Sequence, residues 1–576
     1  MGMDPNRKPL APPTVPAHFS VYTCLTVLAA FVGLALISGE SFASSATYDE
    51  VAYLRAAAHW WRTGDQSEIT RMGSPLTFWK LQQAPVLWLL DLAGRCKWID
   101  DPIRHQQELL PLARLGSSWI WLLTFGFTTL WSRQSYGPRA MTFAAWLFAL
   151  SPNVLAHAGL VTMELPLIAA TTAMLYLFWQ FLASGRFVWF WSAAAAGGLA
   201  FSCKFTAILV PPILAVVWWV MRYQRGERTI FALSTRVAIR MVGFLCMLLL
   251  VDAAITGFAR LPLSTSHGSH PTIERWFGRE CGKLVVHLYE IPLPQDWVGF
   301  ATQMHHQSSG GPSYLFGARR MHGWWYYYLV AVAVKVPFAF WILVAARLTL
   351  YYWRPDDVSP QDFNSLLPLV FVLYLGITAA GSSRNYGFRY LLPLAPLAIV
   401  WISAIVGDLH AWSGRFSVFT RCAAVTGIAG YALAVAGIHP YELTYFNALS
   451  GGPLGGRRIL ADSNLDWGQG LKSLARLQRE RSELSNITLY YFGDTEPVHY
   501  GVAGASHTIN ALGDNRSLTS LDSVDTPFLA VSASLQWGPW GPPGFFEKLK
   551  CMTPVLMTDD TTIAIYRTSD LKRIQK

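Results

Sequence analysis

Long apolar runs constrain this chain more than any other feature of its sequence. Stretches of about 20 mostly apolar residues, the length that crosses the hydrocarbon core of a bilayer, recur along most of the chain. Composition agrees, because 52% of the 576 residues are apolar and only 14% are charged. A soluble protein carries about a quarter charged residues. The sequence therefore predicts a mainly α-helical, polytopic membrane protein.

About eleven membrane-spanning helices are expected, and the first is expected to be an uncleaved signal anchor. They are predicted at residues 20–38, 112–131, 141–157, 160–182, 188–203, 205–221, 237–257, 325–350, 365–381, 389–406 and 418–437. The stretches 39–111 and 258–324 then become external loops. A transmembrane domain over 1–437 is followed by an extracytoplasmic domain over 438–576.

Basic residues orient the spans. A short Pro-rich tail, residues 1–19, precedes the first span and is predicted to be cytoplasmic. The short loops on the same side carry Arg133, Arg139, Arg186, Arg222, Arg225, Arg228, Arg354 and Arg415. Cytoplasmic loops are enriched in basic residues, so the formal net charge of +10 is explained without a nucleic-acid partner.

The last 139 residues have a different pattern from the spans. Alternating runs predict strands at 487–492, 528–532 and 561–566. A helix is predicted over residues 465–480, capped by Asp462, Ser463 or Asn464. This pattern indicates a small α/β domain outside the membrane.

The seven cysteines are scattered along the chain without a CxxC pair or any other ligand spacing. They predict neither a metal site nor a disulfide framework.

An acidic pair, Asp49 and Glu50, follows the first span within a few residues. Apolar residues then recur at helical spacing from Val51 to Trp61, which places the pair in the first turn of an amphipathic helix. Successive residues of a helix point about 100° apart, so the two carboxylates are expected to have different partners. Acids in a first helical turn also offset the positive helix end, which is the plainer explanation of the pair.

Polar residues of both charge signs collect near the predicted outer face. They are Asp49, Glu50, Arg55, His157, Glu164, Lys204, Asp252, Arg384 and Arg389. The cations suit a phosphate and the carboxylates suit an acid–base step. For any single member, an interfacial ion pair is the alternative. Lys335 is the one ionisable group predicted near mid-membrane, where pairing with an acid such as Asp252 would hold helices together.

Four segments form a recognisable series: 48–53 (YDEVAY), 157–166 (HAGLVTMELP), 198–206 (GLAFSCKFT) and 389–393 (RYLLP). In this order, and on one predicted side, they resemble the C-type glycosyltransferases that use polyprenyl-phosphate sugars. This superfamily includes protein O-mannosyltransferases and the transferase that adds aminoarabinose to lipid A. The segments 445–447 (YFN) and 462–469 (DSNLDWGQ) resemble a tail found in a bacterial branch of the superfamily.

The resemblance implies a membrane glycosyltransferase, placed in a bacterial inner membrane with its site outside. It implies a polyprenyl-phosphate sugar as donor and a protein or glycolipid as acceptor. No cofactor follows from it, and family members differ in metal use. The polyprenyl phosphate leaves as a stable anion, so one carboxylate base together with cations on the phosphate suffices, and inversion at C1 is the natural outcome.

The resemblance also suggests roles for individual residues. Asp49 is the expected base, and Glu50 and Glu164 are expected to orient groups in the site. The candidates for binding the donor phosphate are Lys204, Arg384, Arg389, Arg55 and Lys80. Two departures from the family pattern stand out: Glu164 lies where Asp is usual, and a Pro-Pro motif after His or Lys is replaced by Gln82-Gln83-Ala84-Pro85.

Two other classes of protein share part of this pattern. A secondary transporter would place ionisable groups near mid-membrane, often in two repeated halves, and only Lys335 fits that description. A lipid-binding protein without catalysis would explain the external domain and the basic face, but not the acids at several outer helix ends.

Overall fold

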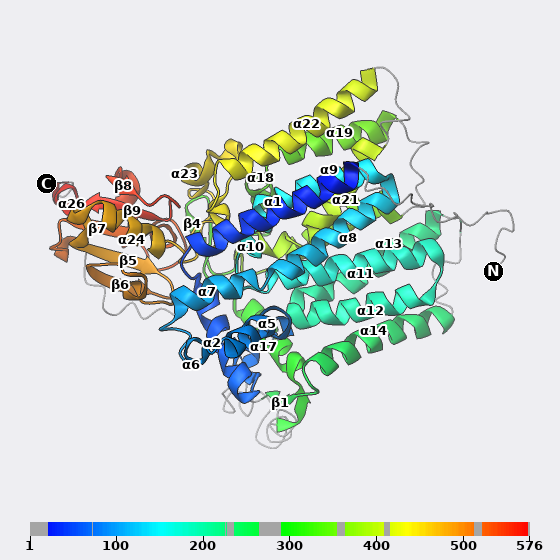
Figure 1. Cartoon of the computed structure of the whole chain (residues 1–576), viewed down its shortest axis with the longest axis horizontal. Helices are drawn as coiled ribbons and strands as arrows, with labels where there is room; N and C mark the ends of the chain where they lie inside the picture. Colours follow the sequence, from blue (N-terminus) through cyan, green and yellow to red (C-terminus); the bar gives the residue numbers. More distant parts are fainter. Residues whose placement is uncertain are drawn as a thin grey trace.

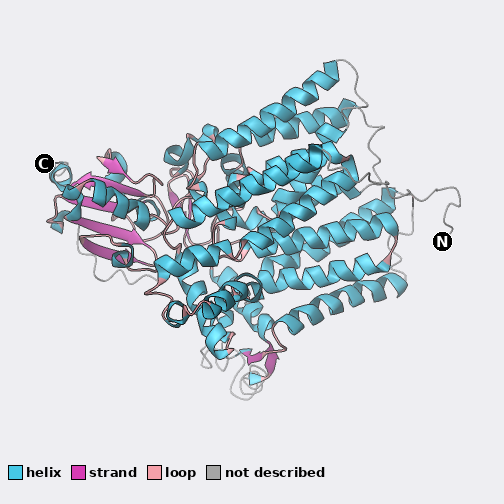
Figure 2. Ribbon diagram, in the orientation of Figure 1, coloured by secondary structure: helices cyan, strands magenta, loops and turns pink. Residues whose placement is uncertain are grey.

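The computed structural model describes residues 21–224 without 72 and 76, and residues 226, 235–263, 290–353, 363–407, 415–511 and 521–573. Helices dominate these residues, and a small sheet lies at one end of the helical bundle (Figures 1 and 2). The predicted fold class, a mainly helical membrane protein with a small C-terminal α/β part, is confirmed. The predicted tail 1–19 and Arg225, Arg228 and Arg354 lie outside the described residues.

Each predicted span contains a helix or a broken pair of helices. Most of the bundle consists of α1 (Val21–Ala43), α8 (Ser118–Tyr136), α9 (Pro138–Ala149), α11 (Glu164–Ser184), α12 (Phe187–Cys203), α13 (Val210–Gln224), α14 (Thr235–Ile255), α20 (Leu367–Gly381), α21 (Leu394–Gly407) and α22 (Arg415–Ala436). Among the described residues, six helical segments are long and apolar enough to cross a membrane, or seven if one bent pair is counted. The protein is thus an integral membrane protein, while the count of eleven crossings stays a prediction.

Two predicted spans are broken, and proline explains both breaks. The predicted span 325–350 contains two helices, α18 (Tyr327–Lys335) and α19 (Phe338–Trp353), which meet at 100°. Pro337 lacks an N–H and disfavours the helical conformation of Val336, which is extended at φ −85° and ψ 139°. The predicted span 141–157 likewise ends at Leu150, and α10 (Pro152–Ala158) restarts with a proline in its first turn.

Basic residues lie at one end of the bundle. Arg133 and Arg222 lie in the last turns of α8 and α13, and Arg415 begins α22. These helix ends lie at the end of the bundle away from the sheet (Figure 1). The prediction that these arginines share one side is confirmed, and their cytoplasmic location stays a prediction.

The two stretches that were predicted to be external form short elements over the other end of the bundle. The first contains α2 (Tyr48–Thr63), α3 (Ser67–Arg71), α4 (Thr77–Gln82), α5 (Ala84–Leu92), α6 (Cys96–Asp100) and α7 (Gln106–Leu115). The described part of the second contains β1 (Arg260–Pro262), β2 (Pro292–Pro294), α17 (Gln295–Ser309), β3 (Ser313–Leu315) and β4 (Ala318–Arg320).

The C-terminal part contains a five-stranded sheet with the strand order β6-β5-β7-β9-β8. The strands are β5 (Ile487–Phe492), β6 (Ala505–Ile509), β7 (Phe528–Ser532), β8 (Leu556–Met557) and β9 (Ile563–Arg567), accompanied by α24 (Leu471–Glu480), α25 (Ala533–Gln536) and α26 (Thr568–Arg573). Strands β6, β5 and β7 run parallel, and β9 pairs antiparallel with β7 and β8. The three predicted strands are confirmed.

The predicted helix 465–480 begins six residues late. Asp462, Ser463 and Asn464, the expected caps, form a separate short 3-10 turn, and the helix starts at Leu471. Gly468 has φ +97°, a conformation that favours glycine and cannot continue a helix.

A strap of residues 439–470 joins the sheet to the bundle. The Asn447 amide donates to the carbonyls of Ala333 and Val336, at 2.6 and 2.9 Å. The Lys335 ammonium donates to the carbonyls of Leu443 and Asn464, at 3.1 and 2.7 Å. The strap therefore fills the bend between α18 and α19.

The alternative explanation of Lys335, pairing with an acid such as Asp252, does not hold in the structure. The ammonium of Lys335 binds strap carbonyls, and Asp252 accepts a hydrogen bond from Ser202 at 2.6 Å. Lys335 thus holds the strap in place. The transporter alternative depended on Lys335 alone and loses its support.

Candidate active site

Helix α2 begins directly after α1 leaves the bundle and carries the acidic pair in its first turn. Thr47, the residue before it, is extended, and its backbone N–H donates to the Glu50 carboxylate at 2.9 Å. The backbone N–H of Tyr48 donates to the Trp467 carbonyl at 2.7 Å. A side-chain cap and a backbone bond to the strap therefore fix where α2 starts.

Glu50 is fully buried, and both of its oxygens have partners. Arg114 of α7 donates to them at 2.9 and 2.7 Å, and the Val161 N–H donates at 2.8 Å. Burial by itself raises the pKa of Glu50, but Arg114 outweighs it and the pKa is lowered. Glu50 therefore stays ionised and fixes α2 against the bundle.

Asp49 points to a different partner, as the helical spacing predicted. Its carboxylate accepts from Arg389 at 3.1 Å, and Arg389 also lies 3.7 Å from the Glu164 carboxylate. Lys204 donates to the same Glu164 oxygen at 2.8 Å. We call Asp49, Glu164, Lys204 and Arg389 the four-residue cluster.

The cluster joins segments that are far apart in the sequence. Asp49 lies on α2, Glu164 begins α11, Lys204 directly follows α12, and Arg389 lies in a 3-10 turn before α21. Glu164 is the first residue of α11, a candidate membrane span, and the positive end of a helix favours a carboxylate there. Four separate segments thus converge at one end of the bundle.

Two aromatic rings lie against the cations of the cluster. The Lys204 ammonium lies 4.3 Å from the centre of the Tyr390 ring, and the Arg389 guanidinium lies 4.3 Å from that of Trp467. His157 is also close, with its ring centre 6.5 Å from that of Trp467. Cations over aromatic faces are attracted by the ring quadrupole, so the rings hold the two side chains in place.

Exposure distinguishes the two acids of the cluster. The Asp49 side chain is 26% exposed, whereas that of Glu164 is 2% exposed. Burial raises the pKa of Asp49, and this effect exceeds the lowering by Arg389. Asp49 is therefore the more accessible acid of the cluster, and its pKa lies above that of an ordinary aspartate.

The other predicted phosphate ligands have separate partners. Arg384 donates to the Gly310 carbonyl at 2.7 Å, and Lys80 donates to the Ile255 carbonyl at 2.6 Å. Arg55 is exposed and lies 3.7 Å from Glu68. Among the described residues, no hydrogen bond or ion pair joins these three cations to the four-residue cluster.

Three residues at the site were not assigned a role from the sequence. Tyr390 and Trp467 lie within the quoted motifs, but no pattern marked their rings as cation partners. The sequence did carry a signal for Arg114. A charge at the start of a predicted span is costly without a partner, so a buried ion pair could have been expected there. Within the described residues, no group of three or more His, Cys, Asp or Glu is placed to hold a metal ion.

Three solved structures of two proteins are similar to this chain. ArnT from Cupriavidus metallidurans bound to undecaprenyl phosphate has 13% identity and a TM-score of 0.46, covering 95% of this chain and 98% of its own. Its apo form has 15% identity and a TM-score of 0.48, with the same coverage. The archaeal oligosaccharyltransferase AglB from Archaeoglobus fulgidus has 13% identity and a TM-score of 0.44, covering 89% and 69%.

Sequence comparison gives a family match for part of the chain. Residues 112–251, about a quarter of the chain, match the family described as dolichyl-phosphate-mannose-protein mannosyltransferase. No curated protein matches the chain significantly. The matched segment contains Glu164 and Lys204 of the cluster. The resemblance to glycosyltransferases that use polyprenyl-phosphate sugars is confirmed over these residues.

Proposed function

We propose that the protein transfers a sugar from a polyprenyl-phosphate donor to an acceptor at the membrane surface, with inversion at C1. The observation that carries this proposal is the four-residue cluster, which combines an accessible carboxylate with two cations at the outer ends of separate helices. The family match over residues 112–251 supports the same class of reaction.

In the proposed reaction, Asp49 takes the proton of an acceptor hydroxyl or amine as the acceptor atom bonds to C1 of the sugar. The bond between C1 and the phosphate oxygen breaks, and its electrons stay on the phosphate. Polyprenyl phosphate leaves as an anion, so no strong acid is needed. The acceptor attacks the face opposite the leaving group, which inverts C1.

Arg389 and Lys204 are the proposed ligands of the donor phosphate. Both cations are paired with carboxylates in this structure, at 3.1 Å for Asp49–Arg389 and 2.8 Å for Glu164–Lys204. A phosphate would therefore compete with the acids. When it draws Arg389 away from Asp49, the pKa of Asp49 rises further, because the effect of Arg389 is to lower it. Donor binding would thus make the base stronger.

An apolar cavity next to the cluster suits the isoprenoid tail. It has a volume of about 230 Å³ and lies between α4, α8, α11 and α12. Its lining includes Pro166, two residues after Glu164, and Cys203, the residue before Lys204. Each CH₂ removed from water contributes about 0.8 kcal/mol, so the tail stays in the bilayer and the reaction must take place at its surface.

The sheet offers a place for the acceptor. Its parallel strands β5, β6 and β7 end at Phe492, Ile509 and Ser532, and ligands commonly bind beyond the carboxyl ends of parallel strands. The Phe492 ring stacks on Tyr48, the neighbour of Asp49, with centres 5.5 Å apart. An acceptor at this edge would present its nucleophile to Asp49. We place this side outside a bacterial inner membrane, opposite the basic helix ends.

The proposal is tested by replacing the base. Asp49→Asn should lower sugar transfer by about 10²–10⁴-fold, because the acceptor proton has no base. Transfer is measured in isolated membranes supplied with radiolabelled polyprenyl-phosphate mannose. Asp101→Asn is the matched control, since Asp101 is an exposed aspartate of the same external stretch. Normal expression with undiminished transfer by Asp49→Asn would remove Asp49 as the base.

A further inference from the structure

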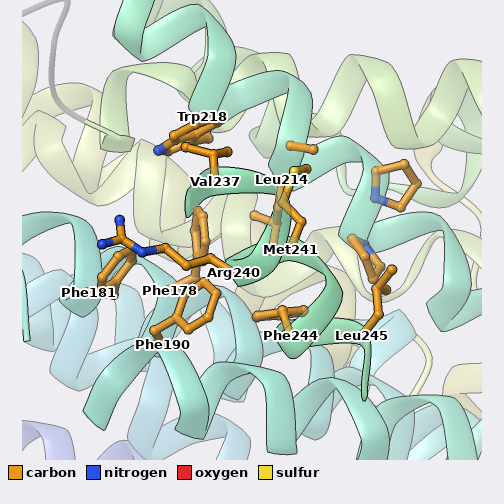
Figure 3. A pocket seen from close by; sticks show the side chains of 13 residues that line it. Phe178, Phe181, Phe190, Leu214, Trp218, Val237, Arg240, Met241, Phe244 and Leu245 are labelled. Carbon is orange, nitrogen blue, oxygen red and sulfur yellow. The ribbon is translucent and has the colours of Figure 1, made fainter. Parts of the chain in front are cut away.

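A second apolar cavity lies in the half of the bundle away from the sheet. Its volume is about 300 Å³, and Phe178 and Phe190 line it together with Leu214 and Met241 (Figure 3). It forms because α14 packs against α12, whereas α13 packs against α20, so α13 and α14 diverge. We call this cavity the α13–α14 wedge.

The wedge opens on a surface suited to lipid. On α14, Ile239, Val242 and Leu245 are 65%, 59% and 48% exposed. Such a helix face in water would be costly, but it is ordinary for a span in contact with acyl chains. The beginning of α14 lies far from the sheet and from α2 (Figure 1). The wedge therefore belongs to the leaflet opposite the four-residue cluster.

One charged residue, Arg240, lines the wedge. Its guanidinium lies 4.8 Å from the centre of the Phe187 ring (Figure 3 shows the guanidinium among the lining side chains). Within the described part of the chain, no carboxylate pairs with Arg240. The Trp218 ring, which also lines the wedge, has the Arg222 guanidinium 4.9 Å from its centre. Positive charge thus borders one end of an otherwise apolar space.

We propose that the α13–α14 wedge binds one anionic phospholipid of the leaflet opposite the cluster. An acyl chain lies between α13 and α14, and the headgroup phosphate pairs with Arg240. Basic pockets between spanning helices at this face bind anionic headgroups by the same charge complementarity.

The chemistry of the wedge distinguishes this lipid from other occupants. A zwitterionic lipid brings its own ammonium group, which Arg240 repels. Inorganic phosphate has no chain to fill the apolar space. A polyprenyl phosphate that reacts at Asp49 has its phosphate at the other end of the bundle.

The purified full-length protein, exchanged into mixed detergent micelles with phosphatidylglycerol or phosphatidylcholine, provides the test. Native mass spectrometry counts the lipids that stay bound. The wild type should retain phosphatidylglycerol preferentially, and Arg240→Gln should lower that retention by about fivefold. Arg421→Gln is the matched control, because Arg421 is exposed in the second turn of α22, the corresponding position of another helix. It should leave retention unchanged.

A second variant separates the cavity from the charge. Ala215→Trp places a large ring in the wedge and keeps Arg240, so it should also lose the bound lipid while its thermal midpoint stays near that of the wild type. Equal retention of the two lipids by the wild type, or equal loss in Arg240→Gln and Arg421→Gln, would overturn the proposal. Undecaprenyl phosphate that displaces phosphatidylglycerol in an Arg240-dependent way would overturn it in favour of a polyprenyl lipid.

Discussion

Two adjacent carboxylates at the start of α2 have opposite surroundings. Glu50 is fully buried and accepts from Arg114, Thr47 and Val161. Asp49 is partly exposed and faces Arg389. Neighbouring side chains on a helix point about 100° apart. This difference in direction places Glu50 in the interior and Asp49 at the site. Substitution of Glu50 should therefore lower stability, whereas substitution of Asp49 should lower transfer.

Glu50→Gln should lower stability while Asp49→Asn should not. Removing one charge of a fully buried ion pair leaves the Arg114 charge without its carboxylate, at a cost of about 3 kcal/mol. The thermal unfolding midpoint in detergent measures this loss. Asp49→Asn, with a side chain that is 26% exposed, serves as the control and should melt near the wild type. Equal midpoints for Glu50→Gln and the wild type would contradict the structural role of Glu50.

The pH profile of transfer should report the pairing of Asp49 with Arg389. In the proposed mechanism Asp49 is a base only when it is ionised, so kcat/KM should fall as the pH drops through its pKa. Arg389 lowers that pKa, and Arg389→Gln should therefore move the acid limb of the profile to higher pH. Arg389→Lys keeps the charge and should restore the limb toward its original position. Arg384→Gln, which removes a bond to the Gly310 carbonyl, should leave the limb in place. If the acid limb of Arg389→Gln stays at the wild-type pH, the pairing with Arg389 does not set the pKa of the base.

At the scale of elements, the positions of the helices could be predicted from the sequence, but the breaks within them could be predicted only in part. Long apolar runs located a helix in every predicted span, because that signal is local. The break at Pro337 had a local signal too, but whether a proline bends a helix by 100° depends on what fills the bend. Here the strap 439–470 fills it, more than 100 residues away in the sequence. The late start of α24 has the same origin, since its predicted first turn is used by the strap.

Lys335 should hold the strap in the bend between α18 and α19. Lys335→Met leaves the buried carbonyls of Leu443 and Asn464 without their donor, at a cost of about 1–3 kcal/mol. Limited proteolysis within 439–470 should become faster, and transfer should fall because Trp467 lies against Arg389. Lys472→Met is the control, as it removes one exposed bond to the Phe42 carbonyl. Equal proteolysis of the two variants would contradict this role for Lys335.

At the scale of the whole molecule, the two ends of the bundle differ in charge and in what covers them. The sheet, the strap and α2 cover the end with the four-residue cluster, and arginines of the last helical turns occupy the other end (Figure 1). This polarity is what a transferase needs if its lipid donor and its acceptor meet on one side of the membrane. The proposed phospholipid in the α13–α14 wedge lies at the opposite end.

Cysteine labelling in intact cells should separate the two ends. In a background with the seven native cysteines replaced by Ser, Glu496→Cys lies in the sheet-bearing part and Arg186→Cys lies between α11 and α12. Both positions are exposed. A membrane-impermeant maleimide should label Glu496→Cys in intact cells, and Arg186→Cys only after lysis. The reverse pattern would place the site in the cytoplasm.

The sequence by itself determined that this is a multi-span membrane protein with a small α/β part, and it identified the segments that meet at the site. Apolar runs, alternation and short motifs are local, so they can be recognised along a single chain. Only the tertiary structure decided which residues of those segments meet. It placed Asp49 rather than Glu50, and Arg389 rather than Arg384, in the cluster with Glu164 and Lys204. Such choices depend on side-chain directions and on contacts between segments hundreds of residues apart, which no local pattern encodes.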